Sequence, residues 1–236
     1  MSNYLNLFIN LLDKNIQKKN LKIIKQYLRG KKINYIDVGA HSGEMILLLS
    51  NHFNIKKIFA FEPNLEIVSE LEKLKIKNLN ISKYALSDKT GDDFLKIGHL
   101  SSMSTLNRIN KNSFYTFIKK VIINFFYKGN TIYKKKIKIK KIRLDKIKDF
   151  KKIKKIDLIK IDTEGHEFNV IKGMGNLLKK TNLILFEYHY DNSLIKGYDF
   201  NKINKYLVSN NFSFISRNKM LFRKGYEIIY KNKIFN

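Results

Sequence analysis

The feature that most constrains the fold is an alternation of short apolar runs with amphipathic segments. Apolar runs at residues 32–39, 56–64, 155–165 and 182–190 are each followed by a segment with helical spacing, and strands are also predicted at 79–88 and 136–147. This alternation predicts an α/β fold with a mostly parallel sheet and helices on both faces. The last two runs, 212–217 and 226–232, predict a hairpin that gives the sheet an antiparallel C-terminal edge strand.

The domain organisation follows from where this pattern starts and breaks. Residues 1–30 have apolar side chains at helical spacing and predict an N-terminal amphipathic helical segment before a main domain at 31–236. The alternation stops at about 98–136, which we interpret as an insertion. Its aromatic segment at 114–130 predicts a buried helix, and a lid or a membrane-touching element are the alternatives.

Composition excludes some classes of site and leaves the partner open. The chain has no cysteine, so it has no disulfide or thiolate metal site. Its formal net charge is +27, but the basic residues are mostly lysines spread along the chain, which favours solvated surface charge over nucleic-acid binding. Without a signal-peptide pattern or a run of about 18 apolar residues, we expect a cytoplasmic protein, with peripheral membrane contact left open.

The sequence "YIDVGAHSGE", residues 35–44, is the most informative turn, since it joins the first predicted strand to a helix. A dinucleotide fingerprint needs glycine at its first, third and sixth places, and counted from Gly39 the third place holds His41. A phosphate loop needs lysine where Glu44 stands. The pattern that remains is Asp37, Gly39 and Gly43, with Glu62 at the end of the second strand. The Glu62 carboxylate, at the end of that strand, can accept hydrogen bonds from ribose hydroxyls. A turn that has an acid and no lysine suits a cationic cofactor such as S-adenosylmethionine.

Six motifs together resemble those of the FkbM-type methyltransferases, a class I group that uses S-adenosylmethionine. In order they are "YIDVGAHSGE", "FAFEPN", "ALSDKTG", "RLDKI", "LIKIDTEGHEFNVIKG" and "LFEYH", and they extend over about residues 33–191. The resemblance implies a Rossmann-like sheet of seven strands. It also implies O-methylation of a hydroxyl on a sugar, glycan or related natural product.

The resemblance also implies which residues surround the cofactor. By position they are Asp37, Gly39, Gly43, Glu62, Ala85 and Leu86. We add the adjoining residues Ala40, His41 and Pro63 as further cofactor-binding candidates. Where many class I enzymes have an acid that binds adenine, this chain has Ala85, and Asp88 follows three residues later. Substrate specificity is expected in the insertion, with Ser104 and Glu164 as substrate-binding candidates.

Candidate catalytic side chains follow two predicted strands. Alternate residues of an extended chain share a face, so Asp162 and Glu164 point one way, and Glu187 and His189 do so on the next strand. A sugar hydroxyl is a poor nucleophile and needs a base. We predict His189 as that base, with Glu187 and Asp162 as alternatives. Helix capping by Asp162 and Glu164 is another interpretation, and Mg²⁺ at Asp162 and Glu187 is less favoured than a site without metal.

The sequence therefore predicts an S-adenosylmethionine-dependent O-methyltransferase with a sugar or glycan substrate. An RNA methyltransferase that uses the basic surface is the main alternative. A non-catalytic cofactor-binding or membrane-associated protein is the third.

Overall fold

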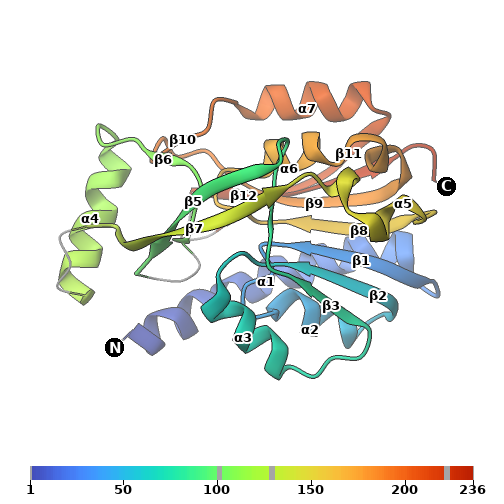
Figure 1. Cartoon of the computed structure of the whole chain (residues 1–236), viewed down its shortest axis with the longest axis horizontal. Coiled ribbons are helices and arrows are strands. Elements are labelled where there is room, and N and C mark those ends of the chain that lie inside the picture. Colours follow the sequence, from blue (N-terminus) through green and yellow to red (C-terminus); the bar gives the residue numbers. More distant parts are fainter. Residues whose placement is uncertain (1, 100–102, 128–130, 221–223, 236) are drawn as a thin grey trace.

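A seven-stranded sheet forms the centre of the computed structural model, which describes residues 2–99, 103–127, 131–220 and 224–235 (Figure 1). The strand order is β11-β12-β9-β8-β1-β2-β3. The strands are β1 (Lys32–Val38), β2 (Asn54–Phe61), β3 (Leu79–Ser82), β8 (Ile156–Ile161), β9 (Thr181–His189), β11 (Phe212–Lys219) and β12 (Gly225–Asn232).

The predicted fold class is confirmed, with one difference in the position of the antiparallel strand. Strands β3, β2, β1, β8 and β9 pair in parallel, and β12 pairs antiparallel with both β9 and β11. The antiparallel strand is therefore second from the edge, and β11 is the edge strand. The reason is the connection: helix α7 (Phe200–Ser209) carries the chain past one strand position, and β12 returns through a hairpin to fill it.

Helices cover both faces of the sheet (Figure 1). One face carries α1 (Ser2–Leu28), α2 (Glu44–Ser50) and α3 (Leu65–Lys73). The other carries α5 (Lys148–Lys151), α6 (Glu167–Gly173), α7 and the 3₁₀ helices η2 (Leu144–Lys146) and η3 (Gly175–Lys180). Each layer packs its apolar side chains against the sheet, so the sheet is buried on both sides.

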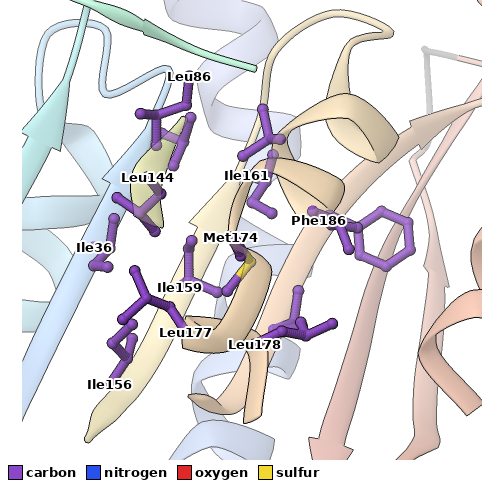
Figure 2. Close-up of a cluster of buried hydrophobic side chains, with 14 of the residues drawn as sticks. Ile36, Leu86, Leu144, Ile156, Ile159, Ile161, Met174, Leu177, Leu178 and Phe186 are labelled. Carbon is purple, nitrogen blue, oxygen red and sulfur yellow. The ribbon is translucent and has the colours of Figure 1, made fainter. Parts of the chain in front are cut away.

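The central strands β1, β8 and β9 are mostly buried because helices cover both of their faces. In β1, Tyr35 belongs to the core cluster under α1 and α2, whereas Ile36 belongs to the cluster under α6 and η3. Figure 2 shows that second cluster, in which Ile36, Ile159 and Phe186 from three neighbouring strands lie with Leu144 and Met174. All five side chains are fully buried. This packing fixes the carboxyl ends of the strands, where the functional residues lie.

The chain between β3 and β8 forms a second layer at the edge of the domain. Strands β4 (Ala85–Leu86), β7 (Tyr133–Ile142) and β5 (Gly91–Gly98) make a three-stranded sheet in the order β4-β7-β5. The strand predicted at 79–88 is thus two strands in different sheets, and β7 ends two residues before Leu144. Strand β6 (Arg108–Ile109) pairs with β10 (Leu194–Ile195), which ties the predicted insertion to the chain after β9.

The aromatic segment of the insertion forms helix α4 (Phe114–Tyr127), and the prediction that it is buried is wrong. Phe114, Phe117 and Phe125 are 75%, 61% and 79% exposed. The helix lies beyond the sheet at one end of the molecule (Figure 1), and its buried residues are Thr116 and Ile123. Residues 100–102 and 128–130 of the predicted insertion lie outside the described residues. No helix in the described part of the chain is long and apolar enough to cross a membrane.

Candidate active site

A cavity of about 500 Å³ lies at the carboxyl ends of β1, β2, β8 and β9. It brings together most of the residues that the sequence predicts for the site. These are Gly39, Ala40, His41, Glu62, Pro63, Ala85, Leu86, Ser104, Asp162, Glu164 and Glu187. Asp37, Gly43 and His189 of the predicted set do not line this cavity.

The turn after β1 is held against the neighbouring strands by its backbone. The amides of Gly39 and Ala40 both donate to the Phe61 carbonyl, at 2.9 and 3.2 Å. Gly39 has φ +74°, and a Cβ atom there would lie 1.9 Å from the Asp162 carbonyl oxygen. Only glycine fits between β1 and β8 at this point, because any side chain would force the two strand ends apart.

Glu62 is fixed at the wall of the cavity by two backbone amides. One carboxylate oxygen accepts a hydrogen bond from the His41 amide at 3.2 Å, and the other accepts from the Asn64 amide at 2.9 Å. Burial raises the pKa of Glu62, and the two amides oppose that rise by favouring the ionised form. The side chain therefore has one orientation, which suits the prediction that it accepts hydrogen bonds from a ribose.

Gly43 and Asp37, two residues predicted to line the cofactor site, instead pack against α3 and lie beside a buried lysine, respectively. Gly43 has φ +85°, and a Cβ atom there would lie 2.6 Å from a methyl group of Leu74, so this glycine serves packing between the turn and the end of α3. Asp37 is fully buried within β1, between β2 and β8, because both of these strands pair with it on either side. Its carboxylate lies 3.7 Å from the Lys160 ammonium.

Lys160 is a cavity residue that sequence reasoning missed. Its ammonium lies 3.3 Å from an Asp162 carboxylate oxygen as well as near Asp37. Burial alone would lower the pKa of Lys160, but the charges of Asp162 and Asp37 raise it above its ordinary value. Among the described residues that line the cavity, it is the only lysine or arginine. The available signal was a lysine between two isoleucines in the strand "IDLIKI", where a buried cation needs a partner.

The loop "DTEG" after β8 is shaped by Glu167, a second residue that sequence reasoning missed. One carboxylate oxygen of Glu167 accepts from the Thr163 amide at 3.2 Å and the Gly165 amide at 2.8 Å, and the other accepts from the Tyr198 hydroxyl at 2.7 Å. Glu164 has φ +49°, a strained conformation for this residue type. The N-cap residue of α6 is His166, so neither Asp162 nor Glu164 occupies that position.

His189 lies between two carboxylates behind the cavity. Its Nε2 atom is 2.8 Å from Glu187 Oε1 and 3.3 Å from Glu164 Oε2. Burial alone would lower the pKa of His189, but the charges of Glu164 and Glu187 outweigh burial and raise it to about 10. The ring is therefore an imidazolium at neutral pH, with no nitrogen free to accept a proton. That charge state conflicts with the predicted role of His189 as the base.

Glu164, Glu187 and His189 also form a group that could offer ligand atoms to a metal ion, the one such group found among the described residues. Their candidate ligand atoms lie within 4.8 Å of one another. They could hold a divalent cation only after His189 has lost its proton, because the imidazolium already occupies the space between the carboxylates. The predicted pair for Mg²⁺, Asp162 and Glu187, does not form a group of this kind, since Lys160 holds Asp162.

The remaining predicted residues lie at the side of the cavity formed by the second layer. Ala85 and Leu86 line it, whereas the Asp88 carboxylate is bound by Lys172 at 2.6 Å and is therefore not an adenine ligand in this arrangement. Ser104 lines the cavity from the start of the insertion. The Thr105 hydroxyl donates to the Glu164 carbonyl at 2.6 Å, so the insertion contacts the loop that carries the candidate substrate residue.

We expect Gly39→Ala to lower the free energy of unfolding by about 2 kcal/mol or more, because its Cβ atom would overlap the Asp162 carbonyl. Gly30→Ala is the matched control, since Gly30 has the same φ of +74° but no atom lies within 4 Å of the place that a Cβ would take. Urea unfolding measures both. Equal losses in the two variants would mean that backbone conformation, and not the contact with β8, explains the glycine.

We expect the stability of the protein to fall more steeply above neutral pH than that of His189→Gln. The raised pKa means that the charged ring stabilises the fold fully below its unfolded pKa of about 6.5, and that this contribution is lost as pH rises through about 10. Between pH 7 and 10.5 the difference should change by about 2 kcal/mol or more in urea unfolding with a chelator present. His52→Gln, at an exposed histidine, should follow the unmodified protein. If the difference in unfolding free energy between His189→Gln and the unmodified protein stayed constant over this pH range, His189 would not be charged between Glu164 and Glu187.

Comparison with known proteins agrees with the motifs. The family model of the methyltransferase FkbM domain matches residues 37–214. The hexuronic acid methyltransferase AglP of Haloferax volcanii is 26% identical over 156 residues, which are 65% of this chain and 54% of that protein. The chain thus spans about half the length of this curated relative.

Solved structures agree on the fold. An FkbM methyltransferase of Methylobacillus flagellatus KT aligns with a TM-score of 0.54 at 13% identity, over 85% of this chain and 43% of that one. The magnesium protoporphyrin IX methyltransferase of Synechocystis, solved with SAH, aligns with a TM-score of 0.55 at 8% identity, over 98% and 88% of the two chains. The same enzyme was also solved with SAM bound. Since the family model matches well over half of its residues, the chain belongs to the FkbM methyltransferase family.

Proposed function

We propose that the protein is an S-adenosylmethionine-dependent O-methyltransferase whose acceptor is a hydroxyl group of a sugar. The observation that carries the proposal is the cavity at the carboxyl ends of the parallel strands, with Glu62 fixed on one side and the pair Glu164 and Glu187 on another. Family membership and the hexuronic acid methyltransferase relative support the reaction and the substrate class.

The chain's own residues fit the cofactor. The backbone turn at Gly39 lines the cavity, and Glu62 presents a carboxylate suited to ribose hydroxyls. Lys160 supplies the positive charge that the cofactor's carboxylate needs, while acidic side chains around the cavity suit its ammonium and sulfonium. When bound, the cofactor would supply a methyl group already activated by a positive sulfur. The protein then contributes mainly alignment of the acceptor.

On the acceptor side, we assign the proton-accepting role to Glu187. Its carboxylate lines the cavity, and the imidazolium of His189 at 2.8 Å favours the ionised form that can take a proton from a hydroxyl. His189 is then a positioning residue that holds Glu187 and Glu164 together. Glu164 and Ser104 are left to bind other hydroxyls of the sugar. Asp162, bound by Lys160, is less suited to the base role.

Cofactor binding is tested first, by calorimetry with S-adenosylmethionine and with S-adenosylhomocysteine. The protein should bind both, and Glu62→Gln should weaken binding at least about tenfold, because the amide has lost the charge and one acceptor for the ribose. Glu72→Gln, at an exposed acid of the neighbouring helix α3, should bind as the unmodified protein does. Binding that is unchanged in Glu62→Gln would remove the proposed cofactor site.

Methyl transfer is tested with labelled cofactor and a panel of glycosides that includes uronic acids and neutral sugars. We expect transfer to at least one sugar, and a decrease in kcat of about 10²- to 10⁴-fold in Glu187→Gln with cofactor affinity unchanged. Glu72→Gln again serves as the control. Label that appears in RNA and in no sugar would support the alternative RNA methyltransferase, and full turnover by Glu187→Gln would move the base elsewhere.

A further inference from the structure

Helix α4 presents an apolar face to solvent that the fold does not explain. Phe114, Phe117, Val121 and Phe125 are all more than half exposed. Their spacing of three and four residues places them along one side of the helix, and Ile122 adds to the same side. Thr116 and Ile123, on the opposite side, are buried. The helix is thus attached by one face, and we call the other, defined by Phe114, Phe117, Val121, Ile122 and Phe125, the α4 face.

The chain segment that carries the α4 face has basic side chains and no acidic ones. The chain contains no aspartate or glutamate from residue 94 to residue 144, although it contains acids elsewhere. Lys111 and Lys120 are exposed beside the α4 face, and Lys134 and Lys136 are exposed on β7 nearby in the chain. Aromatic side chains with lysines at their margin, and no acids, are the composition of helices that lie in the surface of a negatively charged bilayer.

The attached side of α4 connects it to the acceptor side of the candidate active site. The Lys119 ammonium donates to the Ser193 hydroxyl at 3.2 Å, and Ser193 follows β9 by four residues. The Asn110 amide, just before α4, donates to the Ser193 carbonyl at 2.8 Å. Thr105 bonds the backbone of Glu164. A surface that the α4 face contacts would therefore be held at a fixed position relative to Glu164.

We propose that the α4 face is a docking surface for an anionic lipid bilayer, in which its aromatic side chains enter the interface and the surrounding lysines meet the headgroups. The protein then works on acceptors presented at a membrane surface. The docking itself does not depend on the proposed function, because it rests on the composition and exposure of α4 alone. A second copy of the chain or a protein partner on the same face would be an alternative occupant.

Vesicle binding tests the proposal on the full chain. Co-sedimentation should show binding to phosphatidylcholine vesicles that contain about one third phosphatidylglycerol, and at least about tenfold weaker partitioning to phosphatidylcholine alone. The triple variant Phe114→Ser, Phe117→Ser, Phe125→Ser should lose at least about tenfold in partitioning. The matched triple variant Leu65→Ser, Val208→Ser, Phe214→Ser changes exposed apolar side chains elsewhere and should bind within about twofold of the unmodified protein.

A fluorescence measurement separates insertion from simple charge attraction. The chain has no tryptophan, so Phe125→Trp introduces a single reporter whose emission should shift to the blue and be quenched by brominated lipids. Phe214→Trp, on β11, should show neither effect. The proposal is overturned if the unmodified protein does not bind the anionic vesicles, or if the α4 triple variant binds them equally well. Concentration-dependent self-association that the α4 variant abolishes, without vesicle binding, would assign the face to a second copy.

Discussion

The contact between the Gly39 turn and the end of β8 is the constraint on which the site depends. The backbone of Gly39 fits against the Asp162 carbonyl with no room for a side chain, while its amide is bound to the end of β2. The carboxyl ends of β1, β2 and β8 are thereby held close together around this turn. Glu62, the loop after β8 and the cavity between them take their positions from this arrangement, because each is joined to one of those strand ends.

Buried charges around that turn come in balanced groups. Lys160 lies between Asp37 and Asp162, and the imidazolium of His189 lies between Glu164 and Glu187. An isolated buried charge would be costly, so each cation offsets the charge of the two carboxylates beside it. In the proposed reaction this matters because a carboxylate can accept the proton of a sugar hydroxyl only if it is ionised.

The predicted insertion at residues 98–136 contributes both to the cavity side and to the surface of the molecule. Its first part supplies Ser104 and Thr105 to the cavity side, and its helix α4 displays aromatic side chains at one end of the molecule (Figure 1). The two are joined to the same loops after β8 and β9. The proposed acceptor site and the proposed lipid-docking face are therefore connected through the loops after β8 and β9.

Sequence periodicity and motif order determined the parallel sheet, the first glycine turn, and the positions of Glu62, Glu164 and Glu187 at the strand ends, because these depend on local spacing. The tertiary structure alone decided which groups face each other. Asp37 lies behind the cavity since both neighbouring strands cover it, and Lys160 lies between two acids. His189 is kept ionised by one carboxylate from β9 and one from the loop after β8. The exposure of α4 likewise depends on the tertiary structure. An apolar helix looks the same in sequence whether the chain folds over it or leaves it at the surface, because burial depends on contacts distant in the sequence.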